Sequence, residues 1–304
     1  MSSNSKETAS RQRDSEVLAD LLQLMCLERL EENLFRGESR DIGSNRVFGG
    51  QVLGQALSAA TRTVAERVVH SLHAYFLRAG DMEAPIVYEV DRSRDGRSFT
   101  SRRVVAIQHG RPILNLAASF QRVEQGLEHQ VDMPDVPLPE ELPDSRHYNR
   151  EIVSKMPEKM RRYLSIQRPF EFRHVEQRDL FKPQKYSPRQ HVWFRALGSL
   201  PDQPELHRNL LAYVSDYNLI GTAVLPHGVS YLHGKLQMAS LDHAMWFHRE
   251  ARLDQWLLYV LDSPSASGAR GLARGQVFTR AGTLVASTAQ EGLMRLWPER
   301  PADG

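Results

Sequence analysis

The sequence predicts an α+β protein in which one structural unit occurs twice. Each half of the chain has a stretch with helical apolar spacing, followed by a group of strand-like stretches. In each group two long strands are joined by a short turn, which reads HGRP in the first half and RAG in the second. A helix followed by an antiparallel meander, found twice, indicates one long sheet that wraps around two helices.

The two helical stretches cover 49–64 and 207–224. In the second, Leu210, Val214 and Tyr217 recur at the spacing of one helix face. The first is rich in Gly and Ala, and such small residues let a backbone approach its neighbours closely. We therefore expect the first helix to lie close against a curved sheet.

The strands support the repeat through an almost constant offset. Tyr88 and Tyr259 are 171 positions apart, and Ile113 and Leu284 keep the same separation. The opening strand of each group reads SLHAYF in the first half and SLDHAMWF in the second, so Asp242 is one inserted residue. Differences between the two copies should therefore mark the position of a functional site.

We expect the chain to divide into five segments. The first residues are polar, and the region between the two units is rich in Pro and acidic residues, which is typical of a linker. The stretches PFEFRHVEQ and RQHVWFRAL then predict the first strands of the second unit. The predicted segments are a disordered tail (1–18), a first unit (19–121), a linker with a short helix near 150–165 (122–168), a second unit (169–295) and a tail (296–304).

Composition indicates a globular protein of a reducing compartment. The chain has 39 Lys and Arg residues against 37 Asp and Glu, and the resulting formal charge of +2 favours neither nucleic acid nor a membrane as partner. No stretch has the length of a membrane span or the apolar core of a signal peptide. The single cysteine, Cys26, excludes an intramolecular disulfide, and its apolar neighbours predict a helix packed on the body. We expect a cytoplasmic protein without stable membrane anchoring.

Several longer motifs resemble one known family. The stretches FRGESRDIGSNRVFGGQVLGQAL, HSLHAYFLRAGD, YVSDYNLIG, SLDHAMWFHR and LVASTAQEGLMR look like those of the acyl-CoA thioesterase II (TesB-type) family, and the resemblance runs from about residue 21 to residue 295. It implies a double hotdog fold, in which two copies of a long helix are each wrapped by an antiparallel sheet. It also implies hydrolysis of fatty acyl-CoA to free fatty acid and CoA, no metal or redox cofactor, and assembly into a homo-oligomer, either a dimer or a tetramer.

The resemblance further implies three catalytic residues, all in the second unit. The aspartate of the family falls on Asp216 in YVSDYNLIG, its hydroxyl residue on Ser240 in SLDHAMWFH, and its glutamine on Gln290 in STAQEG. Bacterial relatives often have Thr where this chain has Ser240. A serine keeps the hydroxyl and has a freer side-chain torsion.

The residues themselves fit this chemistry in part. Direct attack of water on a thioester needs a group that takes a proton from the water and donors for the developing oxyanion. On the predicted helix Asp216 has apolar neighbours, which should make it a better proton acceptor, although a capping or ion-paired aspartate would look the same. Gln290 alternates with mostly apolar residues, as either a site amide or a core glutamine would. Ser240 is uninformative by itself.

The first unit lacks this set of polar residues. At the offset of 171, Gln290 corresponds to Ser119, and the helical stretch 49–64 contains no acidic residue. We therefore expect one active site per chain, at the seam between the two units.

Two arginines are candidates for the phosphates of CoA. Arg270 and Arg274 lie in the basic stretch SGARGLARG, and arginine binds phosphate through paired hydrogen bonds. The alternative is a strand with solvated arginines. The aromatic residues Trp246, Phe247 and Trp256 are expected to belong to the core, and the alternative is that some of them line an acyl tunnel.

Other functions find less support. The chain has no G-x-S-x-G motif of a Ser-His-Asp hydrolase, and His243 and His248 are five positions apart, the wrong interval for a zinc site on one helix face. Hydration of enoyl-CoA would need a His and an acid paired at a helix start, and we identify no such pair. A non-catalytic protein that binds or senses acyl-CoA is the alternative to a thioesterase.

Overall fold

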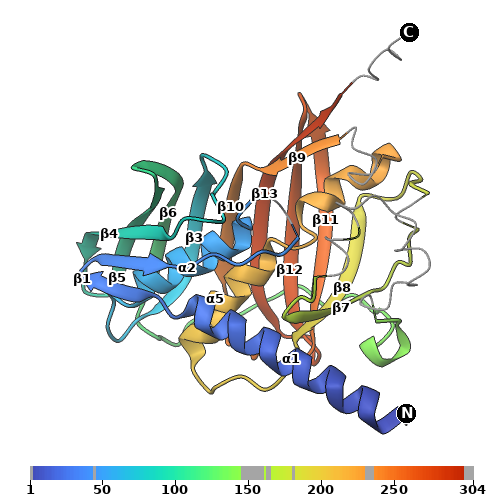
Figure 1. Cartoon of the computed structure of the whole chain (residues 1–304), viewed down its shortest axis with the longest axis horizontal. Coiled ribbons are helices and arrows are strands. Elements are labelled where there is room, and N and C mark those ends of the chain that lie inside the picture. Colours follow the sequence, from blue (N-terminus) through green and yellow to red (C-terminus); the bar gives the residue numbers. More distant parts are fainter. Residues whose placement is uncertain are drawn as a thin grey trace.

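The computed structural model describes residues 3–43, 46–144, 161, 166–179, 182–229 and 236–297 (Figure 1). The first half of the chain contains two helices and six strands within these residues. They are α1 (Ser3–Met25), β1 (Glu28–Glu31), β2 (Leu34–Gly37), α2 (Gly49–Thr61), β3 (Val68–Phe76), β4 (Ile86–Asp95), β5 (Phe99–Gln108) and β6 (Arg111–Gln121).

The second half follows a described stretch of linker that contains the short 3₁₀ helix η1 (Pro139–Glu141). Its described elements are β7 (Phe170–His174), β8 (Arg189–Ala196), α5 (Pro204–Ser215), the 3₁₀ helix η2 (Ile220–His227), β9 (Leu236–Ser240), β10 (Asp242–Phe247), β11 (Leu257–Ser267), β12 (Arg270–Thr279) and β13 (Leu284–Leu296).

All described strands belong to one antiparallel sheet. Its order is β1-β2-β4-β5-β6-β3-β10-β13-β12-β11-β8-β7, with β9 also paired to β13. The strands β3 and β10, which contain the stretches HAYF and HAMWF, therefore lie side by side and join the two halves. In this pair Ala244 is opposite His73, and His243 is opposite Ala74, so the same two residue types exchange places across the seam.

The helices α2 and α5 pack against each other on one side of the sheet (Figure 1). Their backbones approach closely because α2 has glycine at the contact. A Cβ atom at Gly50 would lie 2.1 Å from the carbonyl oxygen of Tyr213, and one at Gly54 would lie 3.0 Å from that of Asn209. The predicted α+β arrangement of two helices and a wrapped sheet is confirmed, and the helix pair forms its centre.

The linker covers a second apolar cluster on the other side of the sheet. Trp193 donates from Nε1 to the carbonyl oxygen of Pro137 at 2.9 Å, and Met133 and Val136 pack on the same cluster. Its buried residues are Trp193, Trp256, Leu258, Phe278 and Leu284. Phe247 is buried in the main core, so two of the three aromatic predictions are correct, but Trp246 is 37% exposed and does not belong to either cluster.

The N-terminal segment differs from the prediction. The helix α1 replaces the disordered tail that we expected up to residue 18, and Leu18, Leu21 and Leu24 are buried in the main core. These apolar residues give the helix a packed face. Cys26, predicted to pack on the body, is exposed just after the helix ends. The short helix predicted near 150–165 lies, Arg161 apart, outside the described residues.

The second long helix is shorter than predicted. The α-helix α5 ends at Ser215 instead of continuing to residue 224, and the 3₁₀ helix η2 follows after a turn. Asn218 in this turn has a left-handed backbone with φ 64°, which an α-helix cannot contain. Asp216 therefore lies at the helix end, and the apolar helical neighbours predicted for it do not form.

The register of the last strand also corrects the predicted alignment of the copies. Arg103 pairs with Ala117 in the first copy, and Arg274 pairs with Ala289 in the second. The offset is therefore 171 for β5 and β12 but 172 for β6 and β13, because the connection between the strands is longer in the second copy. The residue equivalent to Gln290 is Ala118, and Ser119 lies on the opposite face of its strand.

None of the described helices is long and apolar enough to cross a membrane.

Candidate active site

Asp216 is held between the two copies. It is the C-terminal capping residue of α5 and is half-buried. Its Oδ2 accepts a hydrogen bond of 2.9 Å from the backbone N–H of Gly50, in the first turn of α2. A Cβ atom at Gly49 would lie 2.7 Å from the same oxygen, so a side chain there would displace the carboxylate. The positive end of α2 thus faces the carboxylate and stabilises its charge.

The structure brings the three predicted catalytic residues together. Nε2 of Gln290 donates to Oδ1 of Asp216 at 2.6 Å, and Oγ of Ser240 donates to the same oxygen at 3.3 Å. Gln290 is fully buried on β13, and Ser240 is the last residue of β9. Every contact to the Asp216 carboxylate in this set comes from a donor, as an ionised acid requires.

The inserted residue Asp242 explains how Ser240 reaches this position. The chain changes its pairing along β13 here, because β9 pairs Ser240 with Gly292 whereas β10 starts after Leu241. The backbone N–H of Glu291 donates to Oδ1 of Asp242 at 2.6 Å. This side-chain oxygen takes the place of a backbone carbonyl of the neighbouring strand. Burial, and to a smaller degree the nearby Glu291 carboxylate, raises the pKa of Asp242. The insertion thus forms an irregularity in the strand.

His243 is a site residue that the sequence reasoning missed. It is fully buried, and its Nδ1 lies 3.1 Å from Nε2 of Gln290 while its Nε2 lies 3.0 Å from Oγ of Ser215. Burial lowers the pKa of His243 to about 4, which leaves the ring neutral near pH 7. The alternation of buried residues His243, Met245 and Phe247 along β10 was the available signal. The sequence spacing offers this histidine only as a candidate zinc ligand with His248.

In the amide of Gln290 the nitrogen is hydrogen-bonded, and the oxygen has no partner among the described residues. Its Nε2 contacts both Asp216 and His243, which uses the two N–H groups of the amide. Its Oε1 is buried and has no hydrogen-bond partner among the described residues. The site therefore offers an acceptor at Oε1 beside the carboxylate of Asp216.

A tyrosine supports the helix end below the site. The hydroxyl of Tyr259 donates to the carbonyl oxygen of Ser215 at 3.0 Å and lies 2.8 Å from Oγ1 of Thr288. Burial raises the pKa of Tyr259 far above its ordinary value, so the hydroxyl stays protonated and able to donate. These contacts join α5 to β11 and β13 directly before Asp216.

The arginines considered for CoA do not reach this set of residues. Arg270 and Arg274 are exposed on β12, where Gly271, Ala273 and Gly275 face inward. Arg270 pairs with Glu291 at 2.9 Å, and Arg274 pairs with Asp262. Both guanidinium groups thus lie on the face of the sheet opposite Gln290, and their role in CoA binding stays a prediction.

A buried arginine belongs to the equivalent cross-strand pair of the first copy, where Arg102 is opposite Ala118 as Ala273 is opposite Gln290. Arg102 is 2% exposed, and its guanidinium donates to Oγ1 of Thr63 at 2.9 Å and to the carbonyl oxygen of Thr63 at 3.1 Å. It also pairs with Asp95 at 2.7 Å. Thr63 comes directly after Arg62, the capping residue of α2, whereas Asp216 is itself the capping residue of α5. In the first copy a buried arginine thus links the end of the helix to the sheet. In the second copy this link is made by an acid and an amide.

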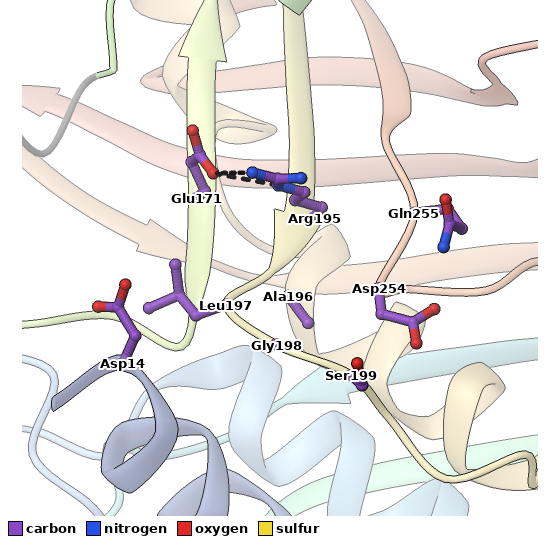
Figure 2. Close-up of a pocket in the computed structure, with 9 residues that line it drawn as sticks. All are labelled: Asp14, Glu171, Arg195, Ala196, Leu197, Gly198, Ser199, Asp254 and Gln255. Atoms are coloured by element: carbon purple, nitrogen blue, oxygen red, sulfur yellow. Dashed lines mark hydrogen bonds and ion pairs between the residues drawn. The ribbon is translucent and has the colours of Figure 1, made fainter. Parts of the chain in front are cut away.

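A pocket of about 330 Å³ lies elsewhere, where the end of β8 meets α1 (Figure 2). It shares no lining residue with the Asp216 site. Glu171 in its wall is bound by Arg195 at 3.0 Å and by Arg173 at 2.6 Å, and Asp254 pairs with Arg252 at 2.9 Å. Because these carboxylates are already paired, we assign no ligand to this pocket.

Comparison with known proteins places these features in context. The family model described as acyl-CoA thioesterase matches residues 160–293, and the model described as acyl-CoA thioesterase N-terminal domain matches 36–121. The chain is 43% identical to acyl-CoA thioesterase 2 of Haemophilus influenzae, over 92% of this chain and 99% of the relative.

Solved structures give the same result for the fold. The crystal structure of the acyl-CoA thioesterase II TesB2 from Mycobacterium marinum superposes with a TM-score of 0.74 at 45% identity, covering 90% of this chain and 97% of the other. A protein of unknown function with a hot dog fold from Alicyclobacillus acidocaldarius superposes with a TM-score of 0.70 at 20% identity, covering 92% and 98%. The predicted double hotdog fold is confirmed.

Proposed function

This chain belongs to the acyl-CoA thioesterase family, and from that premise we propose that it hydrolyses fatty acyl-CoA to a free fatty acid and CoA at the Asp216 site. The observation that carries the proposal is the convergence of Ser240 and Gln290 on Oδ1 of Asp216, at 3.3 Å and 2.6 Å. This set matches the needs of direct water attack, because it combines a proton acceptor with groups that orient the water.

In the proposed reaction, Asp216 and Oε1 of Gln290 accept the two hydrogens of the attacking water. The water oxygen adds to the thioester carbonyl carbon while one proton passes to the Asp216 carboxylate. The tetrahedral intermediate then collapses and the C–S bond breaks. The CoA thiolate takes the proton from Asp216 and leaves as the thiol, so the products are a carboxylic acid and CoA.

The first copy contributes to this site through its helix. The N-terminus of α2 presents the Gly50 N–H to Asp216 at 2.9 Å, and its partial positive charge also favours an oxyanion nearby. Asp216 comes from the second copy, so both halves are needed for one site. This geometry supports the expectation of one active site per chain, at the seam.

The test is the substitution Asp216→Asn. We expect at least about a 100-fold lower rate of thiol release from acyl-CoA, because the proton acceptor is lost. Asp202→Asn is the matched control, since Asp202 is 93% exposed and pairs with Arg252, which is not part of the Asp216 site. Near-wild-type turnover in folded Asp216→Asn would remove Asp216 from the mechanism. Saturable acyl-CoA binding without thiol release by the unaltered chain would favour the alternative of a non-catalytic binding protein.

We further propose that the chain forms a homo-oligomer in the cytoplasm. The outer face of the central strands supports this, because Tyr75 is 63% and Trp246 is 37% exposed there. The ring centroids of His73 and Trp246 lie 5.3 Å apart on the same face. Sedimentation should give a dimer or tetramer, weakened by Trp246→Lys but not by Leu127→Lys in the linker. A monomeric unaltered chain at micromolar concentration would contradict the proposal.

A further inference from the structure

We propose that His243, held by Ser215, is a positioning residue that fixes which end of the Gln290 amide faces Asp216. The inference rests on the proposed function, because it assigns Oε1 of Gln290 to the attacking water. It concerns a buried group that has no place in the three-residue site predicted from the sequence.

The hydrogen bonds determine the tautomer of His243. Oγ of Ser215 donates to the carbonyl oxygen of Ala212 at 2.9 Å, which uses its only hydrogen. The contact of 3.0 Å between this oxygen and the His243 ring therefore requires N–H at Nε2. In a neutral ring Nδ1 then carries only a lone pair, and it accepts from Nε2 of Gln290 at 3.1 Å.

This tautomer selects one orientation of the Gln290 amide. With the amide reversed, Oε1 would face both Oδ1 of Asp216 and Nδ1 of His243, which are both acceptors. In the observed orientation, the two N–H groups satisfy both acceptors and Oε1 is left for a donor. Ser215 is the residue before Asp216 in the chain. The contacts from Ser215 to His243, from His243 to Gln290 and from Gln290 to Asp216 therefore form a ring that fixes the amide relative to the acid.

Asp216 alone cannot maintain this orientation through the reaction. Once its carboxylate has accepted the proton of the water, it is neutral and can itself donate, so it no longer rejects Oε1. The ring of His243 carries no charge and takes no part in the proton transfer, and its Nδ1 therefore stays an acceptor throughout. We infer that the histidine keeps Gln290 in place while the intermediate exists.

Three substitutions at position 243 separate positioning from packing. His243→Asn keeps an acceptor oxygen near the place of Nδ1. His243→Gln keeps a polar group near Ser215 but offers no acceptor at that place, and His243→Leu offers neither. We expect about 30-fold lower kcat for the Gln and Leu variants with KM changed less than twofold, and recovery to within about fivefold of the unaltered chain for Asn. Equal loss in Asn and Leu would overturn the proposal, as would unchanged kcat in folded His243→Leu.

A second measurement does not depend on any variant being folded. The ¹⁵N resonances of the His243 ring in the unaltered chain should show a protonated Nε2 and an unprotonated Nδ1 at pH 7. The opposite tautomer would overturn the proposal. If the unaltered chain releases no thiol from acyl-CoA, the proposed function fails while this tautomer can still be found. If Asp216→Asn abolishes hydrolysis and His243→Leu does not change it, only the role of His243 fails.

Discussion

Arg102 and Gln290 belong to equivalent cross-strand pairs of the two copies. Arg102 is opposite Ala118, and Gln290 is opposite Ala273. In the first copy the long polar side chain is Arg102 of β5, which reaches the end of α2. In the second copy it is Gln290 of β13, which reaches the end of α5. The first copy thus places a fixed cation where the second places an amide beside an acid, which leaves it without the groups for water activation.

Arg102 should therefore be important for stability and not for chemistry. We expect Arg102→Met to lower the free energy of unfolding by about 3 kcal/mol, because the carbonyl oxygens of Thr63 and Arg94 lose a buried charged donor. Denaturant unfolding measures this change. The control Arg274→Met removes an exposed ion pair with Asp262 and should cost less than about 1 kcal/mol. Equal effects of the two substitutions would contradict the interpretation.

Gly50 should not tolerate a side chain. A Cβ atom there would lie 2.1 Å from the backbone oxygen of Tyr213, so the helices α2 and α5 would have to separate. We expect Gly50→Ala to destabilise the fold by about 3 kcal/mol and to lower hydrolysis by disturbing the contact with Asp216. Gly221→Ala is the control, since nothing lies within 4 Å of its Cβ position. A stable, fully active Gly50→Ala variant would show that the two helices can separate freely.

The buried His243 should make the fold less stable at acidic pH. Burial lowers its pKa to about 4 in the folded chain, against 6.5 as its ordinary value, although the nearby Asp216 carboxylate opposes this shift. Between these pH values the unfolded chain binds a proton that the folded chain does not bind. The free energy of unfolding should therefore fall by up to about 3 kcal/mol from pH 6.5 to 4.

Denaturant unfolding of the unaltered chain and of His243→Asn across this pH range isolates the contribution of the histidine. The variant should show a smaller decrease with falling pH. The same slope in both proteins would mean that other groups cause the pH dependence.

The predicted role of Arg270 and Arg274 has a separate test. If they bind CoA phosphates, Arg274→Met and Arg270→Met should each raise KM for acyl-CoA about tenfold with little change in kcat, since a charged hydrogen bond to phosphate is lost. Both arginines would first have to leave Asp262 and Glu291. Unchanged KM in both variants would leave them as solvated arginines, which was the alternative from the sequence.

Much of the architecture follows from the sequence because it depends on periodicity. The pairing of Asp91 with Arg103 and of Asp262 with Arg274 keeps the offset of 171 in the structure. The offset of β13 could not be predicted, because the length of a turn and the place of an irregularity leave no periodic signal. The end of α5 was missed for a similar reason, since the apolar spacing continues through Tyr217 although the helix stops at Ser215.

The site was predictable mainly through resemblance. Residue chemistry alone gave no reason to choose Ser240. For Asp216 it predicted apolar neighbours on one continuous helix, but the helix ends at Ser215. The structure shows that Arg270 and Arg274 are exposed on β12 and alternate with buried small residues, a pattern that the sequence analysis did not use. Arg102 lies in a run of charged residues that resembles a solvated strand, and only the structure shows its burial.

The antiparallel pairing of β3 with β10 explains why the first copy is needed although it lacks the catalytic residues. If either copy were lost, the remaining one would present this strand as a bare sheet edge, ready to add strands from other molecules. A duplicated gene product of this kind can discard the catalytic groups of one module, but it cannot discard the module without risking aggregation.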